Sequence, residues 1–143
     1  MIYFNIYKGE VFDMENSKDL TRREQREEII KKLYEIDINK EFLDVESEYD
    51  YIVESIEGVL SNLHKIDEII INNLVNWKIN RLTFVDRAII RFAVYELYYT
   101  DTAHEIVINE ALNLTRKYSD EGDSKMVGFT NKVLDNIKIY LKK

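Results

Sequence analysis

The stretch that decides the fold is RLTFVDRAIIRFAVYELYYTDTAHEIVINEALNLTRKYSDEGDSKMVGFTNKVLD, residues 81–135. Apolar residues recur in it every three or four positions, the spacing that places them on one face of an α-helix. The segment 84–99 is apolar nearly all round, which predicts a central helix buried on several sides. Residues 103–118 and 125–141 each carry one apolar row, so we expect two amphipathic helices to pack beside it.

The same spacing continues towards the N-terminus and predicts helices over residues 22–37, 47–63 and 66–76. The chain has no proline and only four glycines, so little interrupts a helix. The sequence therefore predicts an all-α fold of six or so helices with short connections, over a helical domain of residues 21–143.

Helix starts are marked by residues that can cap them. Thr21 with Glu24, and Thr102 with Glu105, have the spacing of capping boxes, in which a hydroxyl and a carboxylate satisfy free backbone N–H groups. A weaker version is Thr83, with an acid three residues later.

Residues 1–20 do not share the helical pattern. Their first part, MIYFNIYKGEVF, is aromatic and β-prone, and Lys8-Gly9 suits a turn. A lone hairpin is marginally stable in water. This N-terminal extension is therefore expected to pack on the helices, to pack on a partner chain or to stay mobile, and the sequence leaves all three open.

The composition is that of a single globular domain, with 143 residues, 45% hydrophobic and 33% charged. The absence of cysteine excludes disulfides and thiolate chemistry and fits a cytoplasmic protein. No apolar run approaches the ~18–20 residues of a membrane span, and the N-terminus lacks the order of a signal peptide. We therefore expect a cytoplasmic protein without a membrane partner.

The net charge of −7 argues at first against nucleic acid, because phosphate repels an acidic surface. However, residues 41–76 hold nine acids against one base, Lys65, whereas residues 21–40 and 77–143 are weakly positive. The acidity belongs to one segment, so a small basic surface elsewhere is compatible with the sequence.

Arg22, Arg23 and Arg26 open the first predicted helix. Guanidinium groups contact phosphates and stack on unpaired bases, so these residues are candidates for RNA binding. The alternative is a solvated first turn that neighbouring glutamates neutralise.

Tyr118 and Phe129 flank the loop 119–128, with Lys117 and Lys125 close by in sequence. Aromatic rings beside basic groups suit single-stranded RNA, because every base has a face to stack. The alternative for both rings is core packing.

Nothing in the sequence supports catalysis. Glu96 and Glu110 lie among apolar helix residues and are better explained by helix–helix hydrogen bonds. The two histidines, His64 and His104, lack the further ligands of a helical metal site, and no phosphate-binding, zinc-protease or hydrolase motif occurs. We therefore expect no enzyme activity, no cofactor and no metal.

Four segments in chain order resemble the NusB transcription antitermination family: RREQREEIIKKLY (22–34), VDRAIIRFAVYEL (85–97), INEA (108–111) and FTNKVLD (129–135). The resemblance covers about residues 21–141 and implies a helical bundle of two helical subdomains. The chain departs from the family pattern before the third segment, where a proline is common, and in a longer loop after Tyr118. The extension is also atypical.

The resemblance further implies binding of single-stranded boxA RNA in ribosomal RNA leaders. It implies a partner, the small ribosomal-subunit protein NusE, within an RNA polymerase antitermination complex. RNA binding is carried over to Arg22, Arg23, Arg26, Tyr118, Lys125 and Phe129, and NusE binding to Tyr34, Ile38 and Asp86.

Two other functions stay open at this point. One is the NusB-like RNA-binding accessory domain of an RNA cytosine methyltransferase, and the other is a helical scaffold or homodimer without an RNA role. The sequence does not fix the oligomeric state, the role of residues 1–20, the preferred RNA sequence or the loop residues that touch RNA.

Overall fold

The computed structural model describes residues 19–41 and 44–143, and this part of the chain is all-helical, as predicted. The predicted hairpin in the N-terminal extension lies outside the described residues. The helices are α1 (Arg22–Asn39), α2 (Asp50–Ser61), α3 (Leu63–Asn73), the short 3-10 helix η2 (Ile79–Arg81), α4 (Phe84–Tyr99), α5 (His104–Tyr118) and α6 (Lys125–Tyr140). No helix among these residues is long and apolar enough to cross a membrane.

Capping explains where α1 and α4 begin. Thr21 and Glu24 form the predicted capping box, with the Glu24 N–H donating to the Thr21 hydroxyl and the Thr21 N–H donating to the Glu24 carboxylate. The Thr83 hydroxyl caps α4 by accepting a hydrogen bond from the Asp86 N–H. The predicted capping box at Thr102 is wrong, because α5 starts after Ala103 and the Thr102 hydroxyl accepts a hydrogen bond from Thr100 instead.

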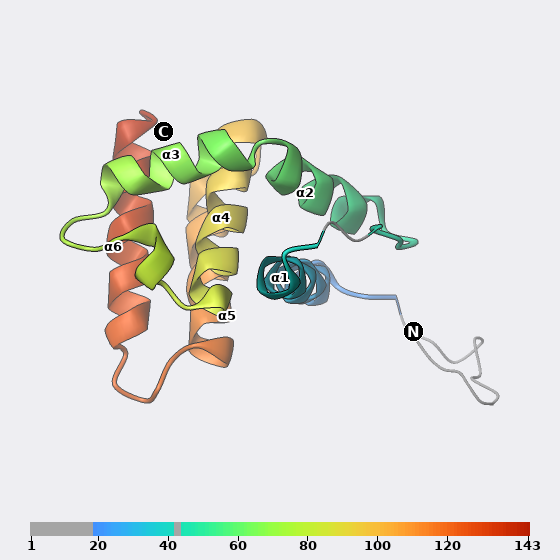
Figure 1. Cartoon of the computed structure of the whole chain (residues 1–143), viewed down its shortest axis with the longest axis horizontal. Coiled ribbons are helices and arrows are strands. Elements are labelled where there is room, and N and C mark those ends of the chain that lie inside the picture. Colours follow the sequence, from blue (N-terminus) through green and yellow to red (C-terminus); the bar gives the residue numbers. More distant parts are fainter. Residues whose placement is uncertain (1–18, 42–43) are drawn as a thin grey trace.

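The central position of α4 follows from its composition. Ten of its sixteen residues are buried, and it contacts all five of the other α-helices in the described part of the chain. In Figure 1, α1 and α2 lie on one side of α4, and α6 lies on the other, with α3 crossing one end. The predicted central helix is confirmed.

Charged groups fix α1 and α3 to α4 at one end of α1. Asp37 of α1 accepts hydrogen bonds from Arg87 (Nε–Oδ2 2.8 Å) and Arg91 (Nη1–Oδ2 3.3 Å) of α4. Arg91 also pairs with Asp67 of α3 through two hydrogen bonds of 2.8 Å. Burial raises the pKa of Asp37, but the hydrogen bonds from Arg87 and Lys40 and the charge of Arg91 outweigh it, so the net pKa is lowered.

Candidate nucleic-acid interface

Two ion pairs join the N-terminal half of α1 to α5. In one pair α1 supplies the cation, and in the other it supplies the anion. Arg23 of α1 donates two hydrogen bonds to Glu110 of α5, from Nε at 3.2 Å and from Nη2 at 3.1 Å. Lys117 of α5 donates to Glu27 of α1 at 2.7 Å. We call this surface the α1–α5 seam, which comprises Arg22, Arg23, Glu27, Glu110, Asn113, Arg116 and Lys117.

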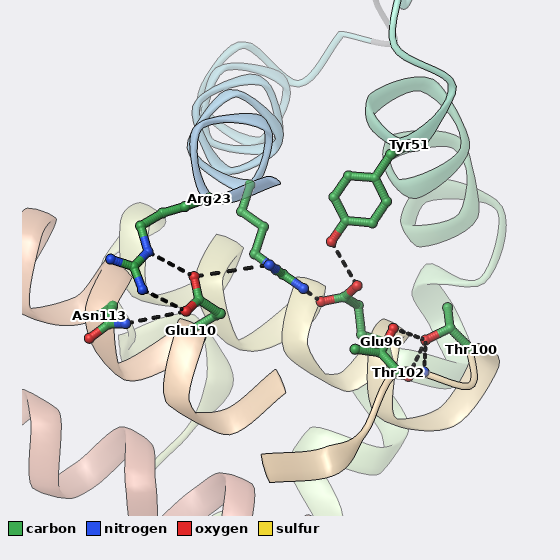
Figure 2. A network of polar contacts seen from close by, with 8 residues as sticks. Arg23, Tyr51, Glu96, Thr100, Thr102, Glu110 and Asn113 are labelled. Carbon is green, nitrogen blue, oxygen red and sulfur yellow. Dashed lines mark hydrogen bonds and ion pairs between the residues drawn. The ribbon is translucent and has the colours of Figure 1, made fainter. Parts of the chain in front are cut away.

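Figure 2 shows how Glu110 is held in the seam. Its carboxylate receives both bonds from Arg23 and one from Asn113 at 3.4 Å, and Arg26 Nη1 lies 4.0 Å away. The Arg23 hydrogen bond lowers the pKa of Glu110 more than burial raises it. The Glu110 side chain is 16% exposed and the Arg23 side chain 64% exposed, so the acid is fixed and the base faces solvent.

Arg26 does not belong to the exposed surface, which corrects the expectation of three available guanidiniums. Its side chain is only 8% exposed, because it lies between Glu96 of α4 and Glu110 of α5. There its Nε lies 3.5 Å from Glu96, which also accepts a 2.7 Å hydrogen bond from the Tyr51 hydroxyl. The predicted structural role of Glu96 and Glu110 in helix–helix contacts is confirmed.

Arg22 remains exposed and forms no ion pair with another described residue. Its guanidinium lies over the ring of Tyr51, with Cζ 3.7 Å from the ring centroid. A guanidinium on an aromatic face keeps its charge and its edge donors available to an anion. Tyr51 therefore orients a cation that α1 carries at its start.

Arg116 is a further exposed cation that the sequence reasoning missed. It lies in the last turn of α5 and donates to the Asn113 side chain at 3.1 Å, and no acid among the described residues pairs with it. Through Asn113 and Glu110 it is linked to Arg23 by consecutive hydrogen bonds. The basic pair Arg116-Lys117 directly before Tyr118 was the available signal.

Tyr118 lies at the junction of the seam and a shallow hollow of about 310 Å³. Its ring is 5.5 Å from Lys117 Nζ, and it lines the hollow together with Tyr34, Ile30, Lys31 and Val85. The ring is partly exposed and packs on the core. Core packing is therefore confirmed for part of the side chain, and the RNA contact stays a prediction.

Of the three residues predicted to bind the partner protein, two are exposed and one is buried. Tyr34 and Ile38 are exposed, at 42% and 41%. The Tyr34 ring meets Phe84, itself exposed, edge to face with centroids 6.4 Å apart, so Phe84 extends this surface. Asp86 is only 2% exposed and bonds to the Thr83 hydroxyl at 2.7 Å, which makes it a capping residue and not an exposed contact.

Phe129 and Lys125 lie away from the arginines. Phe129 of α6 packs partly on the core and against Trp77, with ring centroids 5.9 Å apart. Lys125 is exposed at the start of α6, behind a loop ordered by Asp120 and Asp123. No hydrogen bond, ion pair or ring contact in the described part of the chain joins either residue to the seam.

Comparison with known proteins decides the family. The profile of the NusB family matches residues 11–138 of this chain. The chain is also 40% identical over 126 residues to the transcription antitermination protein NusB of Listeria monocytogenes serotype 4a, an alignment that covers 82% of this chain and 96% of that protein. The chain belongs to the NusB family.

Solved NusB structures have the same fold. The NusB structure from T. maritima matches with a TM-score of 0.72 and 30% identity, over 84% of this chain and 92% of that one. A structure of the antitermination factors NusB and NusE in complex with double-stranded RNA matches with a TM-score of 0.72 and 26% identity, over 83% and 96%. The predicted all-α NusB fold is confirmed, and so is a family role in transcription antitermination and not in catalysis.

Proposed function

We propose that this chain is an antitermination factor that binds single-stranded boxA-type RNA of ribosomal RNA leaders together with NusE. Membership of the NusB family supports the general role, and the related NusB solved with NusE and RNA supports the two kinds of partner. Factors of this kind act where RNA polymerase works, so the proposal places the chain in the cytoplasm, in an antitermination complex.

One structural observation carries the RNA part of the proposal. Arg22 and Arg116 are exposed cations without an acidic partner among the described residues, and each directly precedes a cation, Arg23 or Lys117, that pairs across the α1–α5 seam. Tyr118 adds a partly exposed ring at one side. Cations around an aromatic ring bind the backbone and the bases of single-stranded RNA together.

The partner surface adjoins the RNA surface. Tyr34 and Phe84, with Ile38, present exposed apolar side chains on the α1–α4 side, and the hollow between Tyr34 and Tyr118 connects them to the seam. NusE bound here would lie beside the RNA. The acidic segment 41–76 would attract a basic ribosomal protein over longer distances and raise its association rate.

In this proposal Lys125 and Phe129 extend the RNA surface, and Asp86 supports the partner surface. Lys125 and Phe129 reach RNA only if it continues from the seam towards α6. Asp86 supports the partner surface indirectly, by fixing the start of α4 next to Phe84. The relatives that the chain covers almost end to end are named antitermination proteins, which favours this function over a methyltransferase accessory domain.

The proposal is tested by titrating labelled boxA-type RNA with the wild-type protein and with Arg22→Ala/Arg116→Ala, each with and without NusE. Because the exposed positive patch is small, binding to RNA alone should be weak and salt-sensitive. The double variant should weaken it by about tenfold or more, since it loses two charge contacts. Lys142→Ala/Lys143→Ala, beyond the end of α6, removes the same number of exposed cations and is the matched control.

A further inference from the structure

Arg23 has hydrogen-bond donors that could bind an RNA phosphate, but a carboxylate of its own chain already accepts from them. Nε and Nη2 form one edge of the guanidinium, and both donate to the two oxygens of Glu110, at 3.2 and 3.1 Å. This is the two-point geometry with which arginine also binds phosphate. RNA can therefore take this edge of Arg23 only by displacing Glu110.

We propose that Glu110 is an internal competitor of RNA phosphate for Arg23 and thereby sets the affinity of the α1–α5 seam for RNA. The inference rests on the proposed RNA binding and adds a residue that does not itself contact RNA. It assigns Glu110 a negative effect on affinity, whereas a purely structural role would make its removal harmful or neutral.

The surroundings of Glu110 make this exchange reversible. The carboxylate has two further partners, Asn113 at 3.4 Å and the buried Arg26 at 4.0 Å, and neither contact is made through Arg23. Glu110 would thus not become a partly buried charge without a partner, a state that proteins avoid. Arg23, at 64% exposure, has a side chain free to turn outward.

The magnitude follows from the exposure of the pair. An ion pair with one partner mostly in solvent changes an equilibrium by only a small factor, because water and salt screen it. Removing the competing charge should therefore raise RNA affinity about two- to five-fold, and no more. The pair tunes binding and does not block it.

The first experiment measures binding of labelled boxA-type RNA to Glu110→Gln, Arg23→Ala and the double variant. Glu110→Gln should bind about two- to five-fold more tightly than wild type. In the Arg23→Ala background the same substitution should have no effect, because the competition no longer exists. Glu28→Gln is the matched control, since it removes an exposed carboxylate of α1 that pairs with Lys31 outside the seam.

Two outcomes would overturn the inference. One is unchanged or weaker binding by Glu110→Gln while Arg23→Ala weakens binding. The other is an increase that persists without Arg23 or that Glu28→Gln reproduces, since this would be a general charge effect. If neither Arg23→Ala nor Arg22→Ala/Arg116→Ala weakens binding, the proposed RNA surface itself fails, which is a different result.

A measurement on the wild-type protein covers the case in which Glu110→Gln does not fold. The ¹³C signal of the Glu110 carboxylate and the ¹⁵Nε signal of Arg23 are followed by NMR while RNA is added. Both should shift in parallel with saturation, because each group changes its partner. A Glu110 signal that stays constant at full saturation would contradict the competition.

Discussion

Arg26 and Glu96 form an ion pair between α1 and α4 with the Nε and Oε1 atoms 3.5 Å apart and the side chains 8% and 3% exposed. Tyr51 of α2 completes the group with its hydrogen bond to Glu96. This buried cluster joins three helices directly beneath the proposed RNA surface. It separates the arginines of α1 by role, because Arg26 holds the bundle together while Arg22 and Arg23 face solvent.

Arg26→Ala should lower the free energy of unfolding by about 3 kcal/mol, because Glu96 would be left buried without a cation. Arg22→Ala should cost less than about 1 kcal/mol, since the guanidinium is exposed on a ring. Urea unfolding at neutral pH measures both. A stable Arg26→Ala protein that has lost RNA binding would assign Arg26 to RNA contact and contradict the structural role.

The ionised Asp37 carboxylate should stabilise the folded protein at neutral pH, and this stabilisation should be lost in acid. Its pKa is lowered in the folded state, so its contribution is complete above the unfolded-state value and is lost as the pH falls through the folded-state value, below about 4. Asp37→Asn should cost about 2 kcal/mol at pH 7, because hydrogen bonds to a charged group are lost. Urea unfolding of both proteins between pH 7 and pH 2 should show the difference shrinking with acid, whereas a constant difference would contradict the assignment.

Gly58 allows α2 to approach α4 closely. A Cβ atom at this position would overlap the ring of Tyr95. Alanine is normally the better helix former, yet Gly58→Ala should destabilise by about 1–3 kcal/mol through overpacking. Thermal unfolding of Gly58→Ala and of Gly58→Ala/Tyr95→Ala tests this, since the second change should make the alanine harmless relative to Tyr95→Ala alone.

Arg116→Ala should weaken RNA binding without changing stability, because the side chain is exposed and pairs with no acid among the described residues. If Arg116 contacts one phosphate, the slope of log K against log salt should become less steep by about 0.7. Fluorescence titrations at several salt concentrations measure the slope. An unchanged slope together with unchanged affinity would remove Arg116 from the surface.

The sequence predicted the helices because apolar spacing and caps are local signals, and the burial of α4 followed from its uniformly apolar composition. It did not predict which charges meet across helices. Arg22, Arg23 and Arg26 were predicted as one RNA-binding group, but Arg26 lies on the buried face of α1 with Ile29 and Leu33 and meets Glu96. Asp86 was likewise assigned to a partner, although its own cap buries it.

The two aromatic residues predicted to bind RNA lie apart in the structure, again because of how the helices are oriented. Tyr118 and Phe129 flank one loop in sequence, but α5 brings Tyr118 to the seam and α6 turns Phe129 towards Trp77. Arg116 had a local signal, the basic pair directly before Tyr118, whereas Phe84 was missed because its contact with Tyr34 joins two helices. Such positions follow from helix orientation, which spacing alone does not fix.

The most direct test of the central claim is one titration of labelled boxA-type RNA with wild type and with Arg22→Ala/Arg116→Ala, in the absence and presence of NusE. We expect weak, salt-sensitive binding to wild type that NusE strengthens, with RNA tightening NusE binding by the same factor. The double variant should lose most of this affinity while its free energy of unfolding falls by less than about 1 kcal/mol. Equal RNA binding by both proteins, with or without NusE, would contradict the claim that the α1–α5 seam is the RNA surface.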